Sequence, residues 1–463
     1  MPMRSWNHAT ECEVALRRAR ITCLSSIIGL WILVANAPAE YGPSTTSTST
    51  PPRQLPDDRP YGDETIPSDD LLSCEPWGWK EWFDACDSPG QHWVRGEYLA
   101  WWIPGAHAPP LIATSDDPSV LGDVDSEQTI ALFGGGPIQR EANNGFRLRM
   151  GSWWNCERTR GWEASFFMVR PGSNYARAGS ENGAAIVGRP FIDANTNEPE
   201  AQFVSVEGLS GFVDVRSGST LLGAEILYRR NLFRHGDCCH DSFFKDTAAE
   251  TSHRPKRRFG TRLDAFAGFR YLHYSDSVAI REQLVAIDRP PLLEGTEFDV
   301  FDSFRANNNF YSLALGVDYS GQWRCWYFAV RPQMSVGVVD RRVSIWGETT
   351  VSVPSQPVDQ YVGGLLALES NIGNHRSSQF TVVPELDLQV AYQIRPRWRL
   401  LMGYSCLYFP GLVRAGEQID PVVNPDLIPP VTDPAADPAR PAYLARRSDV
   451  WMHGVTAGIE YRW

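Results

Sequence analysis

Apolar and polar residues alternate with a period of two along most of residues 93–463. In "GFRLRMGSWW", one face is apolar up to the closing Trp residues, whereas the other carries Arg147 and Arg149. Successive side chains of a β-strand point to opposite faces, so this pattern predicts strands that lie between two different surroundings. The pattern recurs in about ten segments without a competing long helical pattern. We therefore predict an all-β fold.

The connections between these segments differ in length in a regular order. Short turns are expected near 155–160, 321–322 and 395–396, and a longer basic connection at 232–259 falls on the same side. Long connections alternate with them and cover 103–143, 172–205, 288–307, 351–379 and 410–448. Transmembrane barrels have short turns at one rim and long loops at the other, and a closed sheet satisfies every backbone group in lipid. We expect an antiparallel up-and-down transmembrane β-barrel of about ten strands, with both termini in the periplasm; splitting 260–287 would give twelve.

The chain is rich in aromatic residues, with 17 Trp, 16 Tyr and 21 Phe. Such rings are enriched where an apolar phase meets water, which agrees with a membrane protein in contact with lipid. We expect an aromatic girdle that contains Trp102, Trp154, Trp162, Tyr461 and Trp463.

The chain ends in a strand-like segment, "VTAGIEYRW", rather than in polar residues. Pairing of the first and last strands would fix these residues by hydrogen bonds, and Trp463 would lie in the periplasmic girdle. The segment also resembles the signal that barrel-assembly machinery reads, so this machinery is an expected partner beside outer-membrane lipid.

The N-terminal region resembles an export signal. Residues 1–39 combine Arg17, Arg18 and Arg20 with an apolar run over 21–35, and cleavage is expected after Ala39. The run is short for a spanning helix, and an uncleaved anchor is the alternative.

Two further segments precede the alternating region. Residues 40–70 are rich in Ser, Thr, Pro and Asp, which predicts a disordered leader. Residues 71–92 form a Trp-rich segment, interpreted as a periplasmic hairpin or plug, with a glycan-stacking patch as the alternative. The barrel is expected to cover residues 93–463.

Charge and cysteines limit the function classes. The formal net charge is −12, and removal of four Arg and two Glu with the signal changes it to −14. Nucleic-acid binding requires Lys and Arg surfaces, so we exclude it. Of nine Cys, seven lie beyond the signal; Cys74 and Cys86 could close a short loop, and the odd number leaves at least one unpaired.

Several blocks resemble one family in the same order along the chain. They include "YLAWWIPGAHAPPLIATS", "GWEASFFMV", "NNNFYSLALGVDY" and "GGLLALESNIGNHRSSQFTVVPE". Residues 93–463 are similar to the bacterial family of putative beta-barrel porins. The resemblance implies an outer-membrane location, gives little information on the solute, and supplies no catalytic residues.

Charged residues on the face opposite the apolar one are the candidate functional residues. We expect the following side chains to line the lumen: Arg95, Glu97, Arg147, Arg149, Glu163, Glu225, Arg229, Arg262, Asp264, Arg270, Asp318, Arg331, Glu385, Asp387, Arg399, Glu460 and Arg462. They could select solutes by their field, or they could fill a narrow lumen with ion pairs. Ten strands enclose little more than their own side chains.

Other motifs carry weaker signals. "HGDCCHD", with His235, Cys238, Cys239 and His240, has metal-ligand residue types, but adjacent cysteines and the lack of a second pair argue against a zinc site. "HRPKRR" is interpreted as a solvated turn rather than a lipid contact. "LFGGGP" lacks the Lys and helix of a phosphate loop, and is expected to be a glycine turn. We predict neither a metal nor a cofactor.

Three functions follow from these observations. The first is an outer-membrane barrel that gives small solutes a narrow passive passage. The second is a closed-lumen structural or adhesion protein that acts through cell-surface partners of its outer loops. The third is a barrel enzyme; the nearest candidate pairs, His273 with Ser275 and His453 with Ser405, have no motif behind them, so no enzyme is predicted.

Overall fold

The computed structural model describes residues 91–138, 142–155, 157–170, 174–235, 259–323, 325–395, 397–430 and 436–463. All of them belong to one compact unit, Cys86–Trp463. The signal and the leader lie outside the described residues, as does the Trp-rich segment apart from its last two residues. No helix in the described ranges is long and apolar enough to cross a membrane.

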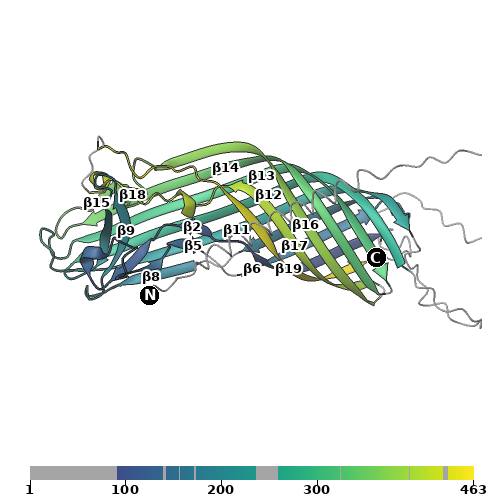
Figure 1. Ribbon diagram of the computed structural model, residues 1–463, viewed down its shortest axis with the longest axis horizontal. Helices are drawn as coiled ribbons and strands as arrows, with labels where there is room; N and C mark the ends of the chain where they lie inside the picture. The colour runs from purple at the N-terminus through teal and green to yellow at the C-terminus, as the bar shows by residue number, and fades with distance from the viewer. Residues whose placement is uncertain are drawn as a thin grey trace, which may run out of the picture. The chain divides into compact units, whose positions relative to one another are not determined.

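Ten antiparallel strands form a closed ring (Figure 1). In ring order they are β1 (His92–Trp102), β6 (Ala142–Trp153), β7 (Arg160–Arg170), β11 (Leu209–His235), β12 (Phe259–Ala286), β13 (Glu297–Trp323), β14 (Trp326–Ser352), β16 (Gly373–Arg395), β17 (Trp398–Leu412) and β19 (Ser448–Arg462). The ring closes between β1 and β19, with register from Trp93 opposite Arg462 to Trp102 opposite His453. The ten-strand prediction is confirmed. The alternative of twelve is wrong, because β12 runs through 28 residues without interruption.

Successive side chains of the ring strands alternate between an exposed outer face and a buried inner face. On β1, Tyr98 is 54% exposed whereas its neighbour Glu97 is 4% exposed. The exposed face of β13 carries Tyr311, Leu313 and Leu315. It becomes polar from Asn309 towards the N-terminal end of the strand. An apolar outer face that ends in polar residues is the arrangement required of a barrel in a bilayer.

The short turns lie at one end of the ring. Asn155 holds the β6–β7 turn, because its Oδ1 accepts the Thr159 backbone N–H at 2.9 Å. The β13–β14 turn comes two residues later than predicted. Gly321 and Gln322 still pair with β14, opposite Phe328 and Tyr327, so the ladder continues to Trp323.

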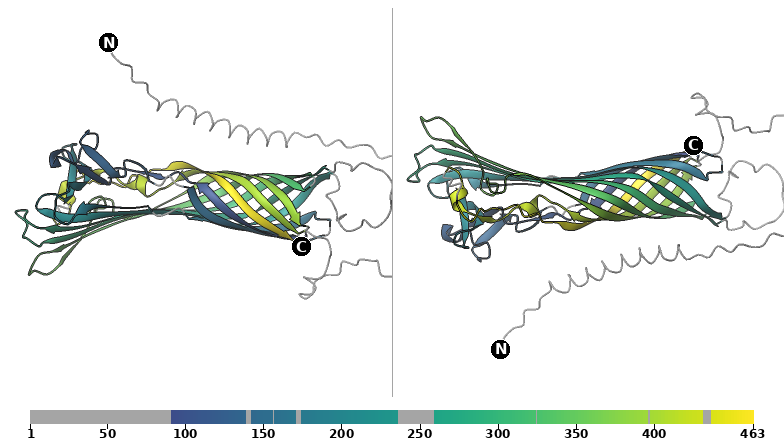
Figure 2. Two further views of the ribbon diagram at one scale, coloured as in Figure 1. Left: turned by 90° about the horizontal axis from the view of Figure 1, so that it is seen from below. Right: turned by 90° about the horizontal axis from the view of Figure 1, so that it is seen from above.

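Four ring strands are much longer than the bilayer requires. β11 to β14 contain 27 or 28 residues each, whereas β1 has 11. Figure 2 shows them running from the ring to the long-loop end. β8 (Asn174–Ser180) pairs with β11 and β15 (Asp359–Val362) pairs with β14 along these extensions. We call the extensions and the long connections that pack on them the head.

The head contains a second sheet built from segments that we predicted to be loops. Its strands are β10 (Pro199–Ser205), β9 (Val187–Asp193), β3 (Ile112–Ser115) and β4 (Thr129–Phe133), with β18 (Val422–Val423) parallel to β9. β2 (Ala106–Ala108) pairs separately with β5 (Gly136–Ile138), and short 3-10 helices are η1 (Pro118–Val120), η2 (Gly416–Gln418) and η3 (Pro425–Leu427). Buried aliphatic and aromatic side chains from both sheets form its core. The loop prediction was wrong because these strands are buried in a packed core and have no face towards lipid, so their residues lack the regular alternation used for the prediction. Residues 297–307 and 373–379, also predicted as loop, belong to β13 and β16.

The glycine turn expected in "LFGGGP" is present between β4 and β5. Gly134 has a φ of 89°, and a Cβ there would lie 2.1 Å from the Pro109 carbonyl oxygen. Only glycine fits this left-handed position.

Candidate functional site: the barrel lumen

All the predicted lumen residues take part in ion pairs with one another. Some of the pairs join strands that are not neighbours in the ring: Arg147 of β6 lies 3.1 Å from Asp387 of β16, and Arg331 of β14 lies 2.5 Å from Glu163 of β7. Such contacts can form only across the lumen, so these side chains point inward. We call this group of nine arginines and eight carboxylates the charged layer.

Glu163 is at the centre of the charged layer. It is 1% exposed, and it lies 2.5 Å from both Arg331 and Arg229 and 3.8 Å from Arg149. A buried carboxylate is tolerated only with partners of this kind, and removal of one partner leaves an uncompensated charge. The charged layer therefore acts as one network rather than as separate pairs.

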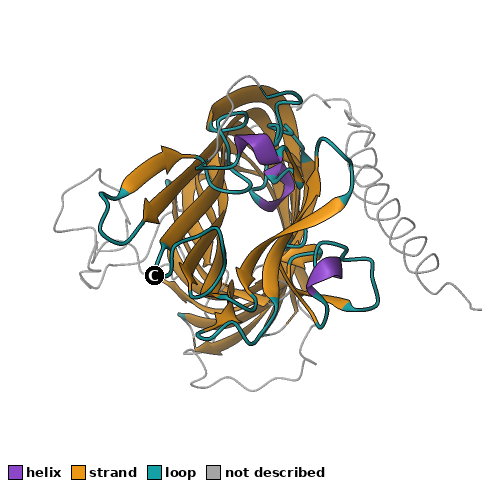
Figure 3. Ribbon diagram, turned by 90° about the vertical axis from the view of Figure 1, so that its left-hand side faces the viewer, coloured by secondary structure: helices purple, strands orange, loops and turns teal. Residues whose placement is uncertain are grey.

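A second group of inward side chains lies between the charged layer and the long-loop end. We call it the apolar layer; it comprises Leu99, Trp101, Ile103, Phe167, Val169, Leu221, Leu272, Tyr274, Phe310, Val339, Val383, Leu407, Phe409, Leu412, Val450 and Met452. Every strand of the ring except β6 contributes to it. The ring of ribbons in Figure 3, seen from the head end, is therefore occupied by packed side chains.

Aromatic contacts cross the lumen within the apolar layer. The rings of Phe310 on β13 and Phe409 on β17 are 5.6 Å apart, although two strands separate them in the sheet. Those of Trp101 on β1 and Phe167 on β7 are 5.7 Å apart. Phe310 and Phe409 are fully buried, so water does not reach them from either end. The lumen is closed at this level in the structure.

The chain folds back over the apolar layer after β17. We call residues 413–418 the mouth segment; it follows Gly411, whose φ is 64°. Asn308 of β13 holds it with two hydrogen bonds: its Nδ2 donates to the Val413 carbonyl at 2.8 Å, and its Oδ1 accepts the Val413 N–H at 2.9 Å. The Ala415 N–H donates to Asp276 at 2.6 Å.

Asp276 lies beyond the membrane-spanning part of β12, which ends where polar outward residues begin at His273. Burial raises the pKa of Asp276 to about 6, against the opposing effect of Arg414, whose Nε is 3.7 Å away. Burial also raises the pKa of Glu282 in the head, although Arg189 pairs with it. The mouth therefore contains a carboxyl group, that of Asp276, which titrates at mildly acidic pH.

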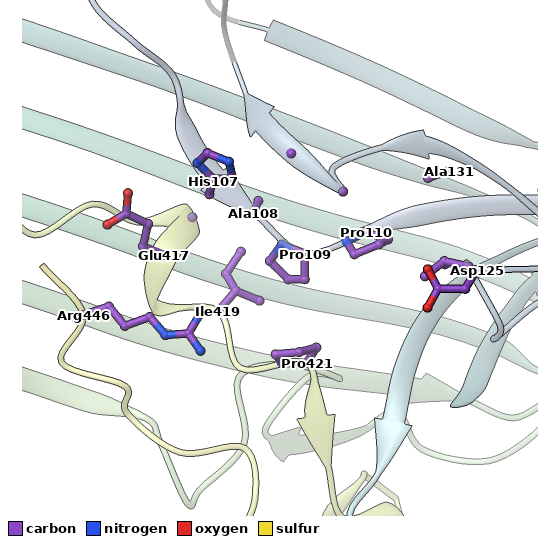
Figure 4. A pocket seen from close by; sticks show the side chains of 14 residues that line it. His107, Ala108, Pro109, Pro110, Asp125, Ala131, Glu417, Ile419, Pro421 and Arg446 are labelled. Carbon is purple, nitrogen blue, oxygen red and sulfur yellow. The ribbon is translucent and has the colours of Figure 1, made fainter. Parts of the chain in front are cut away.

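A pocket of about 570 Å³ lies in the head beside the mouth segment (Figure 4). His107 and Pro109 come from the first long connection, whereas Glu417, Ile419 and Arg446 come from the last. The pocket belongs to the head and not to the ring.

The predicted girdle residues lie at the two ends of the ring. Trp102 is at the long-loop end and stacks on His453 with a centroid distance of 6.0 Å. Trp154 packs on Tyr228 at 5.5 Å at the short-turn end, where Trp162, Tyr461 and Trp463 also lie. Their girdle role stays a prediction.

The candidate catalytic pairs do not assemble. Ser405 points inward and donates to Asp387 at 2.5 Å, whereas His453 is on the opposite face beside the Tyr404 hydroxyl at 3.0 Å. His273 contacts Asn309 at 2.9 Å, and no contact joins it to Ser275 among the described residues. In the described ranges no three His, Cys, Asp or Glu side chains are placed to hold a metal ion. His235 ends β11, and the rest of "HGDCCHD" lies outside those ranges, as does "HRPKRR".

The apolar layer and the mouth segment were not predicted from the sequence. A signal for the layer exists in "GWEASFFMV", where the inward face changes from Glu163 and Ser165 to Phe167 and Val169. No local signal predicts that residues 413–418 lie against Asn308 of β13 and Asp276 of β12, because these strands are far away in sequence.

A family model described as putative beta barrel porin-7 matches residues 93–463. The chain belongs to this porin family. With its apolar outer face, this member of the family is an outer-membrane β-barrel protein. The family assignment from sequence is confirmed.

No curated protein matches the sequence significantly. Among solved structures, this family member is similar to the outer membrane protease OmpT from Escherichia coli, with 8% identity, a TM-score of 0.36, and coverage of 80% of this chain and 96% of that chain. It is also similar to the P. putida toluene transporter TodX, with 9% identity, a TM-score of 0.20, and coverage of 82% and 90%. At such TM-scores neither likeness carries an inference about activity.

Proposed function

We propose that the protein is a closed barrel of the bacterial outer membrane that displays its head at the cell surface, where the head meets partners. The observation that carries this proposal is the contact between Phe310 and Phe409 across the lumen. A static pore needs a continuous aqueous path, and a layer of buried apolar side chains from nine of the ten ring strands removes it. The long strands of the head, which the bilayer does not require, support a role outside the membrane.

A narrow solute channel is the second candidate. The porin family and the charged layer favour it, since a wall of Arg and carboxylate side chains can select ions by sign. In this function the mouth segment and Phe409 leave the lumen to open it. The two candidates differ in whether the wild-type protein passes solutes without a trigger.

Swelling of proteoliposomes in isotonic sugars and salts tests the lumen. We expect no swelling with the wild type, and swelling with the double variant Phe310→Ser/Phe409→Ser. The control is Phe380→Ser, because Phe380 is 64% exposed on the outside of β16 and its loss leaves the lumen closed. Swelling with the wild type as fast as with the double variant would refute the closed barrel.

Cysteine labelling tests the orientation. Cys325 lies exposed in the β13–β14 turn, at the end assigned to the periplasm. Ile130 is exposed in the head and gives a matched probe as Ile130→Cys. On intact cells a membrane-impermeant maleimide should label position 130 and reach Cys325 only after lysis. Labelling in the reverse order would contradict surface display of the head.

A further inference from the structure

Three exposed arginines lie on the outward face of neighbouring strands. They lie just beyond the apolar band, by which we mean the exposed apolar side chains on the outside of the ring. The band ends at Asn309 on β13 and Asp340 on β14, where polar outward residues begin. Arg305, Arg342 and Arg376 follow within two to four residues on β13, β14 and β16. At about 3.3 Å per residue along tilted strands, they lie within about 10 Å of the lipid edge. We call them the arginine cluster.

The arginine cluster has an unbalanced charge. Arg342 is directly opposite Arg376 in the β14–β16 ladder, an arrangement that destabilises a sheet. The two share one carboxylate, Asp340, at 3.1 Å from Arg342 and 3.5 Å from Arg376. Arg305 is on the adjacent strand, diagonal to Arg342, and has no ion pair among the described residues. Three cations therefore face one anion.

The position of the cluster specifies the kind of anion that would balance it. The side chains of Arg342 and Arg376 are 53% and 61% exposed, so they are free to bind. Val338 and Phe380 lie exposed on the same strands, on the lipid side of the cluster. Arginine binds phosphate through two parallel N–H donors, more specifically than a point charge does. The chain is acidic, with a net charge of −12, so general basicity does not explain three arginines here.

We propose that the arginine cluster binds the phosphate groups of an anionic glycolipid of the outer leaflet, whose acyl chains lie along Val338 and Phe380. The phosphates offset the repulsion between Arg342 and Arg376 that Asp340 only half compensates. The ligand is a phosphorylated lipid and not free phosphate, because the apolar band continues directly below the cluster. The proposal rests on the outer-membrane orientation given above.

Binding of bisphosphorylated lipid A to the purified full-length protein in detergent tests the proposal. The test variant is Arg342→Gln/Arg376→Gln. The matched control is Arg177→Gln/Arg281→Gln, which removes two exposed arginines of the same face that each have their own carboxylate and lie further from the band. We expect at least tenfold weaker binding for the test variant, and a change of less than about threefold for the control. A heat-dependent shift on a gel verifies that each variant is a folded barrel.

Two ligand comparisons complete the test. Dephosphorylated lipid A should bind the wild type as weakly as bisphosphorylated lipid A binds the test variant. Inorganic phosphate at the same concentration should not compete with bisphosphorylated lipid A for the wild type. Equal binding by wild type and test variant, or equal binding of both lipids, would overturn the proposal, and competition by inorganic phosphate would show a free-anion site instead. If labelling places the head in the periplasm while this selectivity persists, the proposed orientation fails and the phosphate site stands.

Discussion

The charged layer and the apolar layer occupy the inward faces of the same strands, but they close the lumen by different means. In the charged layer, arginines and carboxylates such as Arg331 and Glu163 are held by ion pairs that could separate as water enters. In the apolar layer, rings such as Phe310 and Phe409 pack without polar groups. Ion pairs give register and rigidity, whereas apolar packing excludes water. We infer that the charged layer contributes mainly to folding specificity, whereas the apolar layer seals the lumen.

The largest effect is expected from Glu163→Gln. Three arginines surround this carboxylate, and removal of its charge leaves nine arginines with seven carboxylates in the buried charged layer, at a cost of about 3–5 kcal/mol of unfolding free energy. Urea-induced unfolding in detergent micelles measures it. The control is Asp318→Asn, which should cost much less, because Asp318 is partly exposed and, among the described residues, pairs only with Arg229. Equal costs for both variants would contradict the network.

A comparable loss of stability, with a different functional result, is expected from Phe409→Ala. Truncation of a fully buried ring leaves a cavity and costs about 3–5 kcal/mol. Unlike Glu163→Gln, this variant should also let small ions pass, because the cavity lies in the sealing layer. Ion flux into liposomes separates the two variants. Leakage through Glu163→Gln but not through Phe409→Ala would reverse the roles that we assign to the layers.

The inward face of the spanning strands was largely predictable, whereas the partners of its side chains were not. Lipid on one side of a strand imposes a period of two, so residues such as Glu97 and Arg147 could be assigned to the lumen from sequence. The contact of Arg147 with Asp387 depends on the shear of the closed ring, which no local pattern encodes. The head was not predictable as strands, because a sandwich core buries segments such as β9 without a regular lipid face.

A smaller effect is expected from pH at the mouth. The pKa of Asp276 is about 6 in the folded protein and 3.8 in an unfolded chain. The contribution of Asp276 to the free energy of unfolding is therefore complete below pH 4 and is lost as the pH rises through 6. Two pKa units correspond to at most about 3 kcal/mol. Asp276→Asn should make the urea midpoint of unfolding less dependent on pH between pH 4 and 7, whereas the control Asp299→Asn should leave that dependence unchanged. An unchanged slope in Asp276→Asn would contradict this assignment.

The smallest effect on stability is expected from deletion of Trp463. Its backbone exchanges two hydrogen bonds with His92, at 2.9 and 3.1 Å, and their loss costs about 1–3 kcal/mol once the barrel is folded. Assembly should suffer more, because the deletion removes the aromatic end of the closing strand. Quantification of folded protein in outer-membrane fractions measures assembly, with Trp398→Ala as a control that keeps the terminus. Normal amounts of the deletion variant would contradict a role for Trp463 in insertion.

Conductance of the wild-type protein in planar lipid bilayers tests the sealed lumen most directly. The apolar layer predicts no current above the lipid background across voltage and pH, in the same preparation whose heat-dependent gel shift shows a folded barrel. Phe409→Ala in parallel should give discrete current steps and verify that insertion has occurred. Stable current steps from the wild type, with an ion preference set by the charged layer, would contradict a closed barrel and favour the channel.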